Sequence, residues 1–137
     1  MNVCCFKSNT VKMNSKIKLE DCDESIKKFT LNGLTTHAKC VKVYDGDSVH
    51  IVMLYNGSYN KFACRLIGIN ADELRGTNVT SAKLARDYLR NLVHEKVVDV
   101  KCHDFDKYGR LLVELTLNGV NINKKMVDDG YAHPYVL

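Results

Sequence analysis

The feature that most constrains the fold is a run of alternating apolar and polar residues between positions 35 and 69. The segments TTHAKCVKVY (35–44) and VHIVMLY (49–55) are separated by DGDS, and NGSYN then leads into KFACRLIGI (61–69). Alternation with a period of two is typical of strands that bury one face, and Asn-Gly is a strong hairpin signal. These residues predict three antiparallel strands joined by two short turns.

The second half of the chain predicts a helix, two further strands and a short closing helix. In TSAKLARDYLRNLVHE (80–95), apolar residues recur every three or four positions, with Thr80 or Ser81 as the expected N-cap. The segment VVDVKCHDFDKYGRLLVELTLNGV (97–120) predicts two strands around a turn, and NINKKMVDDG predicts a helix that ends at Gly130. The order βββ-α-ββ-α is that of an OB-fold, a five-stranded Greek-key β-barrel with helices (an α+β fold).

The length and charge of the chain limit its organisation and its partners. Residues 1–33 are polar and show no sustained period, so we expect an N-terminal extension with little fixed structure. Residues 34–137 are then long enough for one domain with a core of its own. The net charge of +4 permits a polyanionic partner, but it is smaller than the excess expected of a DNA-packaging protein.

The distribution of apolar residues argues against a membrane protein. No run approaches the roughly 20 apolar residues of a membrane span, and the first 25 residues lack the apolar core of a secretory signal. We therefore expect an intracellular, cytoplasmic monomer without an integral membrane segment. Acylation of the adjacent Cys4 and Cys5 is an alternative that would tether the protein to a membrane. Three of the six cysteines stand in strand-like segments, so we expect reduced thiols.

Three turns contain the residues that suggest chemistry: YDGDS (44–48), INADE (69–73) and DKYGR (106–110). Each turn taken alone also has an ordinary structural explanation. However, Arg65 and Arg110 each begin an apolar segment, where a permanently charged group must be paired or hydrated. If both strands belong to one barrel, the two planar guanidinium groups could hold a phosphodiester. The neighbouring carboxylates could bind Ca²⁺ or Mg²⁺, and one of them could act as a general base.

The motifs DGDS, RLIGINADE, DKYGR and LNGVNINKKMVDDGYA stand in this order between about Thr35 and Ala132. Together they resemble the thermonuclease, or staphylococcal-nuclease-like, domain family. The resemblance implies an OB-fold that carries a Ca²⁺-dependent phosphodiesterase, an endonuclease that cuts DNA and RNA. It further implies products with a 3′-phosphate and a 5′-hydroxyl. Mg²⁺ and Mn²⁺ are the other candidate ions.

The resemblance also implies roles for individual side chains. Arg65 and Arg110 match the family's phosphate-binding arginines, and Glu73 matches its proposed general base. Asp47 matches a calcium ligand. Lys107 and Tyr108 match residues near a terminal phosphate of the bound nucleotide.

The loop at residues 70–73 departs from the family's usual Asp-Thr-Pro-Glu. Asn70 replaces a carboxylate and attracts a dication less strongly, Ala71 could supply its backbone carbonyl, and Asp72 is an additional candidate ligand. We therefore expect weaker metal binding. Further along, Tyr135 could stack on a base, although packing would explain it equally well.

Two other functions are compatible with the sequence. A nuclease-like OB domain that has lost much of its catalysis could serve as a nucleic-acid or protein-binding module, and Asn70 favours this alternative. The retained Arg65, Glu73 and Arg110 argue against it, because a binding module has no need for the glutamate. A plain OB domain for oligosaccharides or proteins would leave the two arginines unexplained.

Overall fold

The computed structural model of the chain describes residues 17–73 and 77–136. Cys4 and Cys5, and with them the alternative of acylation, lie outside these residues. Within this part of the chain, no helix is long and apolar enough to cross a membrane.

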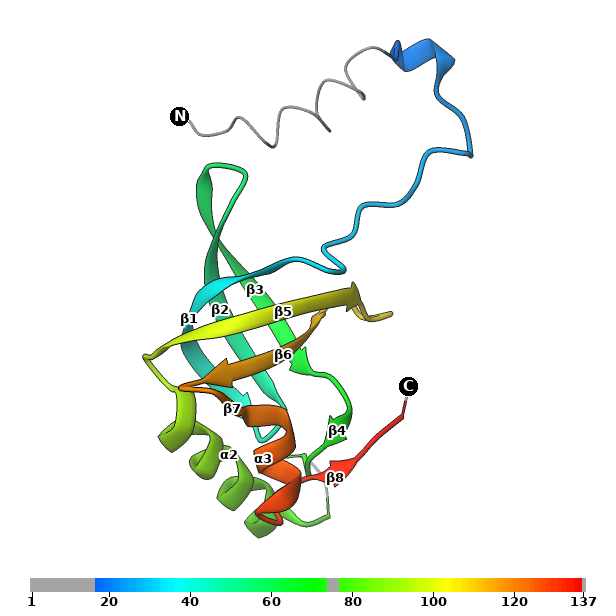
Figure 1. The fold of residues 1–137 in the computed structure, drawn as a ribbon. Helices are drawn as coiled ribbons and strands as arrows, with labels where there is room; N and C mark the ends of the chain where they lie inside the picture. Colours follow the sequence, from blue (N-terminus) through cyan, green and yellow to red (C-terminus); the bar gives the residue numbers. More distant parts are fainter. Residues whose placement is uncertain (1–16, 74–76, 137) are drawn as a thin grey trace.

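The main strands close into a barrel, which confirms the predicted fold (Figure 1). Neighbouring strands follow the order β3-β2-β1-β5-β6, and a further pairing between β3 and β6 closes the sheet. The predicted order βββ-α-ββ-α is present, with three additional strands of two residues each. The main strands are β1 (Thr35–Asp45), β2 (Ser48–Tyr55), β3 (Ser58–Leu66), β5 (Val97–Phe105) and β6 (Leu111–Leu117); the short ones are β4 (Ile69–Asn70), β7 (Val120–Asn121) and β8 (His133–Pro134).

Helices α2 (Val79–Val93) and α3 (Ile122–Asp128) pack below the barrel, and a 3₁₀ turn, η1 (Leu19–Asp21), lies in the N-terminal segment (Figure 1). The predicted N-cap of α2 was wrong: Asn78, not Thr80 or Ser81, caps the helix, and its Oδ1 accepts a hydrogen bond from the Ser81 N–H at 3.3 Å. Asparagine caps as well as serine does, so the helix begins earlier. Gly130 follows the end of α3 with a φ of +86°, as predicted. The buried residues of α2 are Ala82, Ala85, Leu89 and Val93.

Strand β3 ends earlier than predicted. The segment 61–69 predicted a strand through Ile69, whereas β3 ends at Leu66 and Arg65 is its second-last residue. Gly68 has a φ of +84°, a left-handed conformation that ends the strand and turns the chain into β4. The side chain of Arg65 therefore extends from the end of β3, at the end of the barrel wall.

The parallel pairing of β3 with β6 brings the two arginines onto neighbouring strands. In its register, Arg65 lies opposite Leu112, and Arg110 stands two residues before Leu112. The turn after β3 is tied to β6 as well, because the N–H of Ile67 donates a hydrogen bond to the carbonyl of Val113 at 2.9 Å.

Asn123 of α3 forms hydrogen bonds with both the turn after β3 and strand β6. It is 4% exposed, and its Nδ2 donates hydrogen bonds to the carbonyls of Ile67 and Val113, both at 2.9 Å. Its Oδ1 accepts a hydrogen bond from the N–H of Leu115 at 3.1 Å. A buried amide that is satisfied in this way joins α3, β6 and the turn after β3 at one point.

The N-terminal segment contacts the barrel before β1 begins. Leu31 belongs to the hydrophobic core, and the N–H of Gly33 donates a hydrogen bond to the carbonyl of Cys102 at 2.9 Å. The ring of Phe29 lies 6.1 Å from that of Tyr55. The domain boundary after residue 33 stays a prediction, and residues 29–33 already pack against the domain.

The cysteines of the described residues are free thiols, as predicted. Burial raises the pKa of Cys40 and of Cys102 to about 11, and it raises the pKa of Cys64 further. Uncharged thiols in these strands therefore serve as small buried hydrophobic groups.

Gly46→Ala should lower the free energy of unfolding by about 1 to 3 kcal/mol, which urea unfolding would measure. A Cβ at position 46 would lie 2.6 Å from the Cβ of Ala85 and 2.9 Å from that of Ala71. Adding Ala85→Gly should restore part of the loss, although a glycine inside a helix itself costs about 1 kcal/mol. A Gly46→Ala protein as stable as the wild type would contradict this close packing.

Candidate active site

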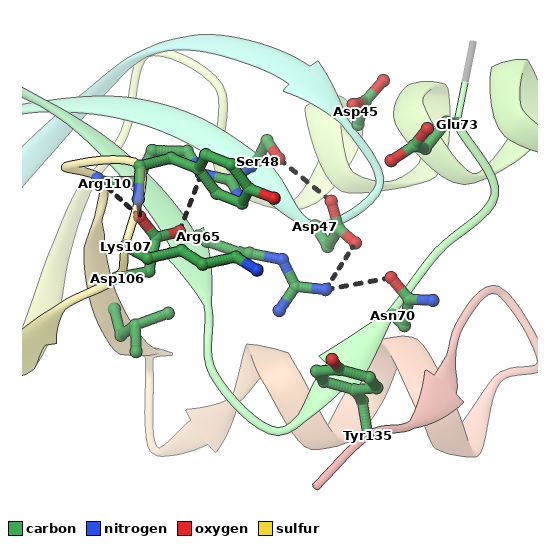
Figure 2. Close-up of a pocket in the computed structure, with 12 residues that line it drawn as sticks. Asp45, Asp47, Ser48, Arg65, Asn70, Glu73, Asp106, Lys107, Arg110 and Tyr135 are labelled. Atoms are coloured by element: carbon green, nitrogen blue, oxygen red, sulfur yellow. Dashed lines mark hydrogen bonds and ion pairs between the residues drawn. The ribbon is translucent and has the colours of Figure 1, made fainter. Parts of the chain in front are cut away.

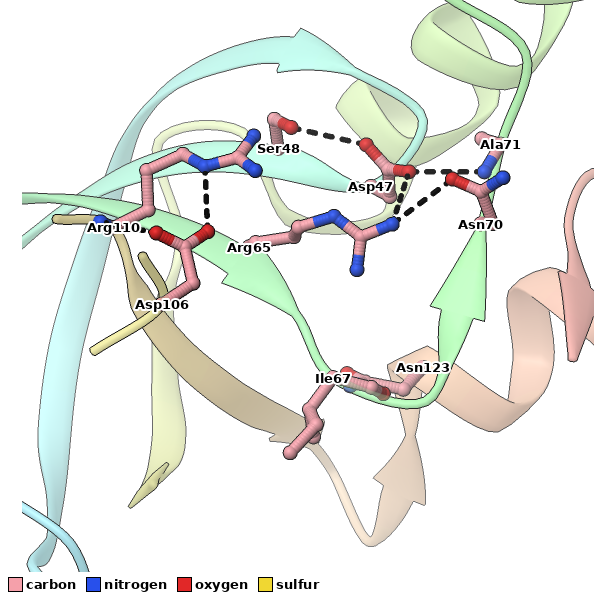
Figure 3. Close-up of polar contacts among 9 residues, drawn as sticks. All are labelled: Asp47, Ser48, Arg65, Ile67, Asn70, Ala71, Asp106, Arg110 and Asn123. Carbon is pink, nitrogen blue, oxygen red and sulfur yellow. Dashed lines mark hydrogen bonds and ion pairs between the residues drawn. The ribbon is translucent and has the colours of Figure 1, made fainter. Parts of the chain in front are cut away.

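The turn between β1 and β2 directs the carboxylate of Asp47 into the protein. Gly46 lets the turn approach α2 closely, and Asp47 is 6% exposed. Its Oδ1 accepts a hydrogen bond from the Ser48 hydroxyl at 3.0 Å, and its Oδ2 accepts one from the N–H of Ala71 at 2.9 Å (Figure 3). The carboxylate thus joins the β1–β2 turn to the loop after β4.

Arg65 reaches the same carboxylate from the end of β3. Its Nη2 donates a hydrogen bond to Oδ1 of Asn70 at 2.9 Å and lies 3.6 Å from Oδ2 of Asp47. The side chain is only 11% exposed, and no described residue accepts a hydrogen bond from its buried Nη1. A buried guanidinium nitrogen without an acceptor is costly, so this half of the fork is suited to an anionic ligand.

Arg110 is held by Asp106, four residues earlier in the turn between β5 and β6. Oδ1 of Asp106 accepts hydrogen bonds from the N–H groups of Tyr108 and Arg110, and its Oδ2 accepts one from Nε of Arg110, all at 2.9 Å. Gly109 completes the turn with a φ of +85°. Figure 3 shows the two terminal nitrogens of Arg110 directed away from Asp106. They are therefore placed to bind a ligand.

These hydrogen bonds also set the charge of Asp106. Its burial alone would raise the pKa of the carboxyl, but the N–H groups of Arg110 and Tyr108 and the Arg110 side chain outweigh burial and lower that pKa. Asp106 is thus an anion at neutral pH, and it orients Arg110 without being needed as a proton donor.

The predicted catalytic residues meet at one pocket of about 480 Å³ (Figure 2). Glu73 is exposed at its margin, while Asp47 and Arg65 lie deeper. Four carboxylates and two guanidiniums around a single cavity could bind a phosphate group and position water beside it. The lining residues are Asp45, Asp47, Ser48, Arg65, Asn70, Glu73, Asp106, Lys107, Tyr108, Arg110, Leu112 and Tyr135.

The predicted metal ligands do not form a ready-made cage. Asp47 and Asn70 line the pocket, but both already bind other groups, and Ala71 meets Asp47 through its N–H. Asp72 is half-buried and is not among the lining residues. Among the residues that the structure describes, no three His, Cys, Asp or Glu side chains are grouped closely enough to hold a metal ion.

The predicted nucleic-acid-binding residues lie around the same pocket. The Nζ of Lys107 is 5.2 Å from the centre of the Tyr108 ring, and the guanidinium of Arg110 is 5.6 Å from it. The guanidinium of Arg65 lies 5.2 Å from the ring of Tyr135, which is 43% exposed. The Tyr135 N–H binds the carbonyl of Gly68 at 2.8 Å, so pairing of β8 with β4 holds this ring beside Arg65.

Three polar residues of the pocket, Asp45, Ser48 and Asp106, were not predicted from the sequence. Asp45 and Asp106 stand inside the quoted motifs YDGDS and DKYGR, so their positions were available. The signal for Asp106 was its place at the start of an Asp-x-x-Gly turn, because aspartate often accepts hydrogen bonds from the N–H groups that follow it.

Comparisons with known proteins identify the family that the chain resembles. Residues 63–137 match the family profile described as staphylococcal nuclease homologue. The chain is 31% identical over 100 residues to proteins named uncharacterized endonuclease from Escherichia coli O157:H7 and Escherichia coli, which covers 72% of this chain and 61% of each relative. It is 32% identical over 108 residues to endonuclease YhcR of Bacillus subtilis (strain 168), covering 70% of this chain and 9% of that protein. The chain therefore spans only part of the curated relatives that it matches.

The lowered pKa of Asp106 predicts a specific dependence of stability on pH. Charged Asp106 stabilises the fold above the ordinary aspartate value of 3.8, and this contribution is lost as the pH falls through the lower pKa of the folded state. Between about pH 5 and pH 2, the free energy of unfolding should fall more for the wild type than for Asp106→Asn. Urea unfolding at several pH values would measure both slopes. Asp21→Asn, at an exposed position of η1, is the control, and equal slopes for the wild type and Asp106→Asn would refute the assignment.

Proposed function

This chain belongs to the family of staphylococcal nuclease homologues, and on that premise we propose that it is a metal-dependent nuclease that hydrolyses phosphodiester bonds of DNA or RNA. The observation that carries the proposal is the convergence of Arg65, Arg110 and Glu73 on one pocket. The relatives named endonucleases support it. We also propose that the protein acts as a monomer.

Substrate binding rests on the two guanidiniums. Nη1 of Arg65, which is buried and has no acceptor among the described residues, would donate a hydrogen bond to a non-bridging phosphate oxygen. The terminal nitrogens of Arg110 would bind a second oxygen, with Asp106 fixing their direction. Such donors stabilise the charge that grows on the phosphate oxygens during the reaction, and they need no reorientation when it occurs.

The reaction is an in-line displacement at phosphorus by water. Glu73 accepts a proton as the water oxygen forms its bond to phosphorus, and the bond between phosphorus and the 5′ oxygen breaks. The leaving 5′ oxygen takes up a proton from solvent, so the products carry a 3′-phosphate and a 5′-hydroxyl. The exposed position of Glu73 at the pocket margin gives water access to the carboxylate.

A divalent cation, Ca²⁺ first and Mg²⁺ or Mn²⁺ as alternatives, fits the donor chemistry of the pocket but would bind weakly. Asp45, Asp47 and Glu73 offer hard oxygen ligands around the cavity. Asn70 has no negative charge, and its oxygen already accepts a hydrogen bond from Arg65. When bound, the ion would supply positive charge at the phosphate, and Asp47 is the residue that would chiefly hold it.

The alternative is a module that binds nucleic acid but has lost much of its catalysis. It is favoured by Asn70, whose amide holds Arg65 where the family's usual residue is a carboxylate. In that case the pocket would still bind a phosphodiester through its arginines. Cleavage and binding assays on the same strand separate the two functions.

Glu73→Gln should lower the rate of cleavage by about 10²- to 10⁴-fold, because the amide cannot accept the proton of water. A fluorescently labelled single-stranded oligonucleotide, incubated with Ca²⁺, Mg²⁺, Mn²⁺ or EDTA, would give the rate and name the ion. Glu24→Gln, an exposed substitution in the N-terminal segment, is the matched control. Wild-type rates in Glu73→Gln would refute the role of the glutamate, and binding without cleavage under any condition would support the alternative.

Asn70→Asp should raise the affinity for Ca²⁺ roughly tenfold in calorimetric titration without substrate, because it adds a carboxylate to the pocket. Asn91→Asp places the same charge at an exposed position of α2 and should leave the affinity unchanged. An unchanged affinity in Asn70→Asp would remove the basis for weak metal binding through Asn70.

A further inference from the structure

A second hollow adjoins the candidate active site. Its volume is about 220 Å³, and Asp45, Ser48 and Arg110 line both this hollow and the active-site pocket. Tyr44 and His50 also line it, so it opens over β1 and β2 beside the pocket. We refer to this second hollow as the outer groove. The two hollows therefore lie next to each other and share these three side chains.

Two exposed lysines stand on the strands beside the outer groove. In the strand pairing, Lys42 lies opposite His50, and β3 places Ala63 on the other side of His50, with Lys61 two residues before Ala63. Burial and the positive charges of Lys42 and Lys61 together lower the pKa of His50, which places both ammonium groups near the imidazole ring. The groove therefore has a cation on each flank.

The acidic residues of the segment from β1 to β3 are confined to the pocket. Between positions 35 and 66, which span β1 to β3, the chain contains four lysines or arginines, and its acids are Asp45 and Asp47. The exposed face of these three strands, which lie side by side in Figure 1, is thus positive away from the catalytic end. Such a surface attracts a polyanion and guides it toward the pocket.

An aromatic ring gives the outer groove a second kind of contact. Tyr44 is 49% exposed, and the Nζ of Lys42 lies 5.7 Å from the centre of its ring. An exposed ring flanked by cations is the arrangement with which proteins hold single strands, because each unpaired base can stack while its phosphate meets a lysine. A duplex would keep its bases stacked on one another and could not use this ring.

We propose that the outer groove binds single-stranded nucleic acid. It would hold the nucleotides that come next in the strand after those on either side of the scissile phosphate. Lys42 and Lys61 contact phosphates of these nucleotides, and Tyr44 stacks on a base. The inference rests on the proposed function, because it takes the strand in the outer groove to be the one held by Arg65 and Arg110. It assigns to Lys42, Lys61 and Tyr44 a contribution to the affinity for strands longer than a dinucleotide.

The test compares Lys42→Gln/Lys61→Gln with Lys83→Gln/Lys96→Gln, which removes the same charge from exposed positions that line neither hollow. Affinity for labelled dT₈ is measured in EDTA at several salt concentrations, and cleavage of dT₈ and of a dinucleotide is measured with the active ion. The first variant should lose roughly tenfold in affinity for dT₈, with a salt slope smaller by about 1.4, or about 0.7 for each phosphate contact. It should cleave the dinucleotide at the wild-type rate.

Because binding is measured without cleavage, the experiment distinguishes failure of this proposal from failure of the proposed nuclease activity. If both double variants bind dT₈ equally well, or lose affinity equally, the outer groove is not the path of the strand, whatever the cleavage rates. If neither the wild type nor the variants cleave but the first variant alone loses affinity, the role of the outer groove in binding is supported and the proposed nuclease activity is contradicted. Tyr44→Leu should lower the affinity for dT₈ more than that for an abasic strand of equal length, and equal losses would exclude stacking.

Discussion

The parallel pairing of β3 with β6 is the constraint on which the site depends. It closes the barrel, and its register sets Arg65 beside the residues that follow Arg110. Asn123 fastens the same junction from α3 by binding carbonyls on both sides of it. Two guanidiniums that are 45 positions apart in the sequence therefore share one pocket, because barrel closure places their strands side by side.

The two arginines are held by different means, and each is left with donors to spare. Asp47 and Asn70 engage one nitrogen of Arg65, whereas Asp106 engages Nε of Arg110. The carboxylates of Asp47 and Asp106 offset the charge of the guanidiniums, and the three side chains together fix the direction of the guanidiniums without using all their hydrogen atoms. A phosphate group would complete what the protein leaves unsatisfied, and the positive outer groove next to the pocket would extend that attraction along a strand.

Much of the barrel could be predicted because its signals are local. The alternation in 35–69 and the Asn-Gly turn are properties of short segments, and the apolar face of α2 repeats within its own helix. Arg65 and Arg110 could be identified because a charged residue beside buried neighbours is unusual in any strand. The ending of β3 was misplaced because Gly68 fits an extended strand in the sequence and shows its left-handed conformation only in the fold.

The contacts that hold the arginines could not be predicted from the sequence, for a different reason. The bond from Arg65 to Asn70 exists only because the chain turns at Gly68, so an apparent metal ligand is also a support for the guanidinium. Asp106 stands in a recognisable turn, but its hydrogen bond from Nε of Arg110 and the backbone contacts of Asn123 are formed only in the fold. The chemistry of the pocket was therefore easier to predict than the contacts that hold it in place.

The central claim is that water attacks phosphorus in this pocket, and cleavage of a single-stranded oligonucleotide in H₂¹⁸O tests it most directly. Mass spectrometry of the wild-type products should find one ¹⁸O in the new terminal 3′-phosphate and none in the fragment with the 5′-hydroxyl. Products that carry a 5′-phosphate, or a 3′-phosphate formed without the isotope, would contradict the account.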